Sequence, residues 1–282
     1  MITLRTVGEL RAHVAGVLRE GRRIGFVPTM GNLHAGHHSL ISIARARSDV
    51  VIASVFVNPT QFGPNEDFAR YPRTPDADAE GLAAQGCDVL FLPPVEALYP
   101  NGAHASVKVV VPELPDQLEG AIRPGHFDGV ATVVAKLFNL VQPRLAVFGR
   151  KDYQQLLVIR RLVHDMGYPI EIIGAPIVRE PDGLAMSSRN QYLDAGERQR
   201  ALAIHATLQW MREQVLAGFD SATVEAGARV RLVAAGLVPD YAVLRRADDL
   251  GPVGGSPVRD LVALVAARAG GTRLIDNLAL AD

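Results

Sequence analysis

The sequence predicts an α/β fold: a Rossmann-like, doubly wound parallel sheet, followed by a second, smaller α+β domain. Short apolar runs alternate with helical patterns over residues 1–175. These runs are apolar on both faces, which is typical of strands buried in a parallel sheet. The composition changes near Gly174-Ala175-Pro176, where the alternation stops. We therefore expect one domain over residues 1–176 and a smaller one over residues 177–282.

The elements of the first domain follow from this alternation. The predicted strands are Ile24–Val27, Val50–Val57, Val89–Leu92, Leu145–Phe148 and Ile170–Ile173. The helical patterns between them are His38–Arg47, Pro75–Gln85, Gly129–Val141 and Tyr153–Asp165. Parallel strands joined by helices imply right-handed crossovers.

The second domain is predicted to combine two helices with three strands. Asp194, with Glu197 three residues later, forms a capping-box pattern that opens a long helix. A second helix is expected over Ala222–Ala235. The predicted strands are Tyr241–Arg245, Val258–Ala266 and Arg273–Leu278, and a loop rich in Gly and Pro separates the first two.

Composition and charge exclude several classes of protein. The 282 residues are 48% hydrophobic and 21% charged, as in an ordinary globular protein, and the net charge of −1 argues against a nucleic-acid binder. Cys87 is the single cysteine, so an internal disulfide and a Cys-rich zinc site are excluded. No signal core and no run approaching roughly 20 apolar residues is present, which predicts a cytoplasmic protein. Walker-loop, GxGxxG, HExxH and GxSxG motifs are absent.

Three polar, glycine-containing segments follow three of the predicted strands. They are residues 28–37 after the Ile24 run, residues 58–63 after the Val50 run and residues 149–152 after the Leu145 run. The carboxyl ends of parallel strands share one edge of the sheet, and ligands bind there. Three such segments are better explained by a site than by chance.

The segment His34-Ala35-Gly36-His37 is the most informative of the three. Gly36 lets the backbone come close to a ligand, and a helix beginning here offers N–H groups and its positive dipole end to a phosphate. The two imidazoles add hydrogen bonds to charge that develops in a transition state. The alternative is a surface turn that carries two histidines.

Cations and amides in and just after the third segment also indicate a ligand site. Arg150 and Lys151 stand at the start of a helix, where they oppose its dipole unless an anion lies between. Gln154 and Gln155 occupy the first helical turn, from which one can point into a cleft. The alternative is that the cations turn into solvent.

Three further groups are candidates. Ser187-Ser188-Arg189 lies in a loop able to close over a triphosphate, or is a hydrophilic turn. Gln61 suits a hydroxyl or carboxylate of a small substrate, or is a polar loop residue. Asp78, one of two acids that open the helix at Pro75, either caps that helix or reaches Mg²⁺.

These motifs together resemble the pantoate–β-alanine ligase family, within the HxGH nucleotidyltransferase superfamily. The resemblance spans essentially the whole chain. It rests on PTMGNLHAGH (28–37), FVNPTQFGPNEDFARYPRT (56–74), IRPGHFDGV (122–130), FGRKDYQQL (148–156), DGLAMSSRN (182–190) and TRLIDNLAL (272–280).

The resemblance implies the substrates ATP, (R)-pantoate and β-alanine, the cofactor Mg²⁺ and a homodimer. Such enzymes first form pantoyl adenylate and pyrophosphate, and the β-alanine amine then displaces AMP to give pantothenate. Two rivals stay open: a nucleotidyltransferase of the same superfamily that forms no amide, and a non-catalytic nucleotide- or RNA-binding relative.

The resemblance also assigns roles by motif position. His34, His37 and Lys151 would be catalytic, with His37 as the proton donor. Gln61 and Gln155 would bind pantoate, Gln61 also β-alanine, and Asp78 would bind the metal. Arg150 departs from the acidic residue that is frequent at its position, so its backbone is the expected contact. The ATP contacts would be Met30, Gly31, Asn32, Leu33, His34, Ala35, Gly36, His37, Gly149, Arg150, Lys151, Asp152, Val178, Met186, Ser187, Ser188 and Arg189.

Overall fold

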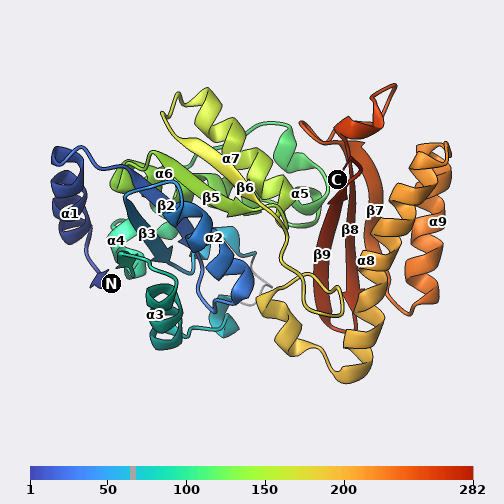
Figure 1. Ribbon diagram of the computed structural model, residues 1–282, viewed down its shortest axis with the longest axis horizontal. Helices are drawn as coiled ribbons and strands as arrows, with labels where there is room; N and C mark the ends of the chain where they lie inside the picture. The colour runs from blue at the N-terminus through green and yellow to red at the C-terminus, as the bar shows by residue number, and fades with distance from the viewer. Residues whose placement is uncertain (64–67, 282) are drawn as a thin grey trace. The chain divides into compact units, whose positions relative to one another are not determined.

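A computed structural model describes residues 1–63 and 68–281 of the chain (Figure 1). The chain forms two compact units. The first contains Met1–Arg150 and Gln154–Pro176. The second contains Lys151–Tyr153 and the chain from Ile177 onward.

A six-stranded, wholly parallel sheet is the centre of the first unit, which confirms the predicted parallel sheet and adds the strand Ile2–Leu4 to the five predicted strands. Its strands lie in the order β1-β4-β3-β2-β5-β6. Their bounds are Ile2–Leu4 (β1), Ile24–Thr29 (β2), Val50–Val55 (β3), Val89–Phe91 (β4), Leu145–Gly149 (β5) and Glu171–Ala175 (β6). The chain moves from β2 toward one edge and returns to β5 on the other side of β2, so a topological switch point lies between β2 and β5.

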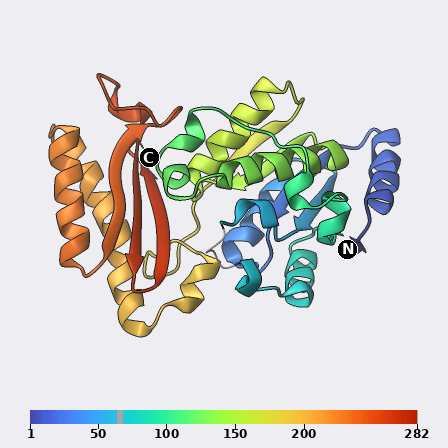
Figure 2. The same cartoon turned by 180° about the vertical axis from the view of Figure 1, so that it is seen from behind.

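Helices cover both faces of this sheet, which confirms the doubly wound architecture (Figures 1 and 2). Phe26 and Ile52 face a core with helices α1, α6 and α7, whereas the neighbouring Val27 and Val51 face a core with α2 and α3. The helices are Val7–Arg19 (α1), Ala35–Arg45 (α2), Pro75–Ala84 (α3), Val95–Leu98 (α4), Glu119–Ile122 (α5), His126–Val141 (α6) and Tyr153–Asp165 (α7). Because successive side chains of a strand alternate between faces, the all-apolar strands supply both cores.

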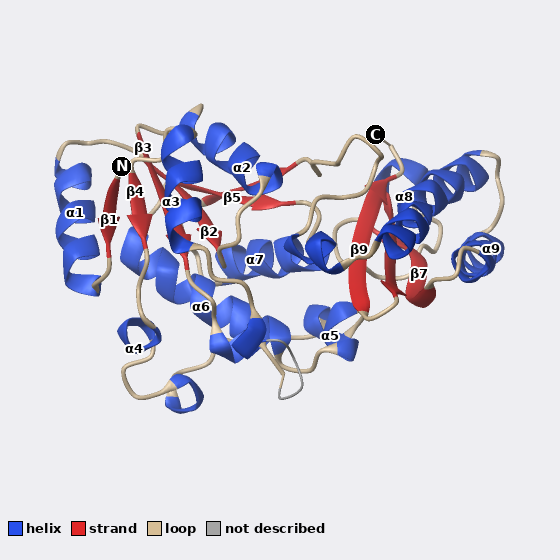
Figure 3. Cartoon of the chain, turned by 90° about the horizontal axis from the view of Figure 1, so that it is seen from below, coloured by secondary structure: helices blue, strands red, loops and turns tan. Residues whose placement is uncertain are grey.

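The second unit is α+β, as predicted (Figure 3). Strands β7 (Val238–Arg246), β8 (Leu261–Ala269) and β9 (Thr272–Ala279) form an antiparallel sheet. Helices α8 (Ala195–Leu216) and α9 (Ser221–Ala234) share a hydrophobic core with it. The capping box of Asp194 and Glu197 is present at the start of α8. Within the described chain, no helix combines the length and the apolar character needed to cross a bilayer.

Helix α6 approaches the loop after β3 more closely than a side chain would allow. A Cβ atom added at Gly129 would lie 2.4 Å from the carbonyl oxygen of Thr60 and 2.7 Å from the nitrogen of Gln61. The Gly129 carbonyl also accepts a hydrogen bond from Asn58 Nδ2 (3.1 Å). Glycine at position 129 therefore permits the close approach of α6 to residues 58–61.

We expect Gly129→Ala to destabilise the protein by about 1–3 kcal/mol, because its methyl group would collide with backbone atoms. Gly16→Ala is the matched control, since Gly16 lies inside α1 with nothing within 4 Å of the added Cβ. That substitution should stabilise by about 0.5–1 kcal/mol. Urea unfolding measures both values, and equal effects would contradict the close approach.

Candidate functional site

The three polar segments leave neighbouring strands at the same edge of the sheet. Strand β2 pairs in parallel with β3 on one side and β5 on the other. Residues 30–37, 58–63 and 149–150 therefore emerge side by side at the carboxyl end, around the switch point where ligands of such sheets bind. The predicted adjacency of these strand ends is confirmed.

The histidine segment forms the N-terminus of α2. His34 is the N-cap residue, and its Nδ1 accepts a hydrogen bond from the backbone N–H of Gly36 (3.1 Å). His37 reaches back, so that its Nδ1 accepts from the His34 N–H (3.3 Å). The two rings lie 4.2 Å apart between centroids. This is a capping box in which both side chains are imidazoles rather than a hydroxyl and a carboxylate.

The capping contacts fix which ring nitrogen carries hydrogen. A backbone N–H can only donate, so Nδ1 of each histidine is an acceptor and is unprotonated. Each neutral ring then has its hydrogen on Nε2. The site therefore presents two N–H donors beside the positive end of a helix dipole, an arrangement suited to phosphate oxygens.

The turn before these histidines is held by Asp78 of α3. Its Oδ1 accepts from the Leu33 N–H (2.8 Å) and its Oδ2 from the Asn32 N–H (3.1 Å). Thr74 Oγ1 donates to Oδ1 (3.2 Å), and Asp78 is 3% exposed. Both carboxylate oxygens are thus engaged inside the protein. The prediction that Asp78 binds Mg²⁺ is not supported by this geometry.

The side chain of Gln61 is oriented by a buried neighbour. Asn58 Nδ2 donates to Gln61 Oε1 (3.1 Å), while the Asn58 Oδ1 accepts from Tyr99 Oη (2.8 Å). Gln61 Nε2 donates to the sulfur of Met30 (3.0 Å), a weak acceptor that a ligand oxygen can replace. Gln61 therefore offers a donor. The sequence pattern does not indicate these roles of Asn58 and Tyr99, because Tyr99 lies 41 residues from Asn58.

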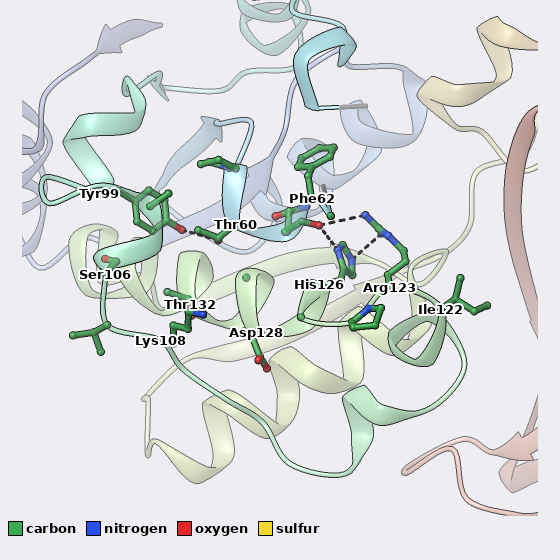
Figure 4. A pocket seen from close by; sticks show the side chains of 18 residues that line it. Thr60, Phe62, Tyr99, Ser106, Lys108, Ile122, Arg123, His126, Asp128 and Thr132 are labelled. Atoms are coloured by element: carbon green, nitrogen blue, oxygen red, sulfur yellow. Dashed lines mark hydrogen bonds between the residues drawn. The ribbon is translucent and has the colours of Figure 1, made fainter. Parts of the chain in front are cut away.

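A cavity of about 500 Å³ is lined by Gln61 together with Thr60, Arg123 and His126 (Figure 4). The carbonyl of Gln61 accepts from His126 Nδ1 (2.8 Å) and from Arg123 (3.4 Å), and Arg123 also donates to His126 Nε2 (3.1 Å). Burial raises the pKa of Asp128 on the wall, and Lys108 partly opposes this rise. With Lys108 and Arg123 in its lining, the cavity suits a small molecule that carries a carboxylate.

The two glutamines at the start of α7 have different roles. Gln154 is 3% exposed, and its amide bonds the Glu119 N–H (3.0 Å) and the carbonyls of Leu114 and Gln117 (2.8 Å each). It therefore fastens residues 114–119, which lead into α5. Gln155 is half-buried, and its amide has no hydrogen-bond partner among the residues that the structure describes. The second glutamine is thus the one available to a ligand.

The cations after β5 belong to different units. Arg150 is in the first unit, where its Nε donates to the Gly174 carbonyl of β6 (3.0 Å). Its side chain thus has a structural partner, in agreement with the expectation that its backbone is the ligand contact. Lys151 is in the second unit, with Nζ 4.0 Å from Asp152 Oδ1 and its carbonyl bonded by Asn277.

The Val178–Asn190 segment of the second unit is a hydrogen-bonded loop. The Met186 N–H donates to the Val178 carbonyl (3.0 Å), and the Arg189 N–H donates to Ser187 Oγ (3.2 Å). Asn190 Nδ2 donates to Glu180 Oε1 (2.8 Å). The Arg198 guanidinium, bonded to Glu180, lowers the pKa of that carboxyl. Ser187 caps the 3₁₀ turn Ser188–Tyr192, which carries Ser188 and Arg189.

The sequence matches a family of known proteins. The family described as Pantoate-beta-alanine ligase matches residues 2–279. A pantothenate synthetase of Xylella fastidiosa (strain 9a5c) is 59% identical over 276 residues, which cover 98% of each chain. A pantothenate synthetase of Stenotrophomonas maltophilia (strain K279a) is 58% identical with the same coverage.

Solved structures of the same kind superimpose on the chain. The crystal structure of pantothenate synthetase from Thermus thermophilus gives a TM-score of 0.93 at 47% identity and covers 99% of both chains. The pantoate-beta-alanine ligase of Francisella tularensis, complexed with beta-gamma ATP and beta-alanine, gives 0.84 at 34% identity. This match covers 100% of the present chain and 98% of the other.

The capping contacts predict the tautomer of both site histidines. In the free protein near neutral pH, His34 and His37 should be neutral with hydrogen on Nε2, because Nδ1 of each accepts a backbone N–H. Long-range ¹H–¹⁵N correlation spectra report the protonated nitrogen directly. His164, whose side chain is 86% exposed, serves as the reference ring. Hydrogen on Nδ1 of either site histidine would refute the capping arrangement.

Proposed function

Since the chain belongs to the pantoate-beta-alanine ligase family, we propose that it condenses (R)-pantoate with β-alanine in two ATP-driven steps. In the first, a pantoate carboxylate oxygen attacks the α-phosphorus of ATP, which forms pantoyl adenylate and releases pyrophosphate. In the second, the β-alanine amine attacks the acyl carbon, which forms the amide bond of pantothenate and releases AMP.

The observation that carries this proposal is the paired-histidine cap at the switch point. Two Nε2–H donors stand at the N-terminus of α2, next to the carboxyl end of β2. Attack at phosphorus builds negative charge on phosphoryl oxygens, and fixed donors stabilise that charge without reorganising. We propose that His34 and His37 contact the phosphates of ATP. Further contacts with ATP come in this proposal from Gly31, Asn32, Leu33, Ala35 and Gly36.

The chemistry needs no protein nucleophile. The substrate carboxylate is itself the nucleophile, so the protein has to align it with the phosphorus and to exclude water from the labile adenylate. We propose that Gln61 donates from Nε2 to pantoate and that Gln155 holds its other end. Gln61 also borders the β-alanine position in this proposal.

We propose that the remaining nucleotide contacts come from residues after β5 and from the loop that contains Met186–Arg189. Lys151 is assigned to the phosphates, and Asp152, Val178, Met186, Ser187, Ser188 and Arg189 to further nucleotide contacts, as are Gly149 and the backbone of Arg150. Mg²⁺ enters with ATP as the metal–nucleotide complex in this proposal, since Asp78 has both carboxylate oxygens engaged by the protein. A homodimer and a cytoplasmic location stay predictions.

The path of oxygen tests the mechanism. With ¹⁸O in the pantoate carboxylate, label should appear in AMP and not in pyrophosphate, because the carboxylate oxygen that bonds to phosphorus leaves with AMP. Mass spectrometry of the products measures this. Formation of ADP and labelled inorganic phosphate would show attack at the γ-phosphorus. Release of pyrophosphate without pantothenate would indicate a nucleotidyltransferase that forms no amide.

We expect His37→Ala to lower the rate of adenylate formation roughly 100- to 1,000-fold, the usual effect of losing one transition-state donor. Loss of its capping bond should cost about 1 kcal/mol of stability, which leaves the variant folded. Pantoate-dependent pyrophosphate release measures the first step alone. His164→Ala is the matched control on an exposed ring. A rate within a few-fold of wild type would remove His37 from the mechanism.

A further inference from the structure

We propose that Asp78 positions the phosphate-contacting turn and is not a ligand of the metal that accompanies ATP. The inference rests on the proposed function, because it assigns His34 and α2 to the phosphates of ATP. It concerns a residue of α3 that lies more than 40 positions along the chain from the turn it holds.

The turn before His34 has an unusual backbone. Gly31 and Asn32 both have positive φ, 87° and 51°, so two consecutive residues are left-handed. Glycine adopts this conformation readily and asparagine more often than other residues with side chains, but two such residues in succession form a specific turn that needs contacts to hold it. The next two residues are Leu33 and the N-cap His34, so the turn determines where α2 begins.

Asp78 supplies the maintaining contacts. Consecutive backbone N–H groups in a turn of this kind point to one side and form a small anion-binding hollow. The N–H groups of Asn32 and Leu33 donate to separate oxygens of the Asp78 carboxylate, at 3.1 and 2.8 Å. A Cβ added at Gly31 would lie 2.9 Å from Oδ2 of Asp78. The carboxylate therefore leaves no space for a side chain at position 31.

The same contacts leave the carboxylate unsuited to a metal. Mg²⁺ requires near-octahedral oxygen ligands and retains several waters. Asp78 is 3% exposed, so the space around its carboxylate does not accommodate a hydrated cation. To reach a cation, Asp78 would have to release the N–H groups of Asn32 and Leu33. Those groups, which are partly buried, would then lose their acceptor, which is unfavourable.

The decisive measurement is made without nucleotide or metal. Asp78→Asn keeps the side-chain shape but turns an NH₂ group toward one of the two N–H donors. If Asp78 positions the turn, the imidazole NMR signals of His34 and His37 will shift in the metal-free variant. If Asp78 acts only as a metal ligand, those signals will stay at their wild-type positions. Asp76→Asn is the matched control, because Asp76 is an exposed acid in the same helical turn.

Kinetics separate the two roles independently. For Asp78→Asn we expect kcat/KM for ATP to fall on the order of 10- to 100-fold, since small misplacements of catalytic groups have effects of that size. The Mg²⁺ concentration for half-maximal rate should stay within two-fold of wild type. A higher Mg²⁺ requirement, with activity recovered by excess metal, would overturn the proposal.

A measurement on the wild-type protein does not depend on the folding of a variant. Mn²⁺ broadens the signals of nuclei near its binding site. Without ATP, it should leave the amide signals of Asn32 and Leu33 unchanged, and selective broadening of both would overturn the proposal. Pantothenate formation by the wild-type protein decides the proposed function separately, so failure of one inference is distinguishable from failure of the other.

Discussion

The pairing of β2 with both β3 and β5 is the constraint on which the site depends. It brings the ends of three strands together, although the segments that follow them are separated by up to about 120 residues. Backbone hydrogen bonds and two apolar cores maintain this pairing, and neither contributes chemistry. The fold thus supplies a fixed edge, and the loops after the strands supply the reactive groups.

The paired-histidine cap connects helix formation to function at this edge. Every helix N-terminus needs acceptors for its first N–H groups, and at α2 the acceptors are imidazole nitrogens. An aspartate or serine would satisfy the helix equally well. Unlike an ionised aspartate, an imidazole can accept from the backbone with one nitrogen and donate to a ligand with the other. The residues that stabilise α2 are therefore the same residues that present donors to a phosphate.

Much of the fold could be predicted from the sequence, because buried parallel strands are apolar on both faces and the α8 cap has a specific pattern. Strand β1 is not predicted by this pattern, because it has three residues and is paired only with β4, far along the chain. Helix α6 begins at His126 rather than Gly129. The sequence also indicates His34, His37 and Gln61, but not their partners. Asp78 shows why: an acid in the first turn of a helix looks the same whether it caps, binds metal or holds a distant turn.

The buried polar side chains at the sheet edge differ in their hydrogen-bond partners. Asn58 and Gln154 are 1% and 3% exposed; Asn58 donates to the Gly129 carbonyl of α6, and Gln154 accepts from the Glu119 N–H at the start of α5. Burial of such groups is unfavourable unless every polar atom is paired, so their contacts hold the loops in one conformation. Gln61 differs, because the acceptor of its Nε2 among the described residues is the weakly accepting sulfur of Met30. A reaction without a protein nucleophile depends on donors held in fixed positions, so the paired amide of Asn58 contributes by orienting Gln61.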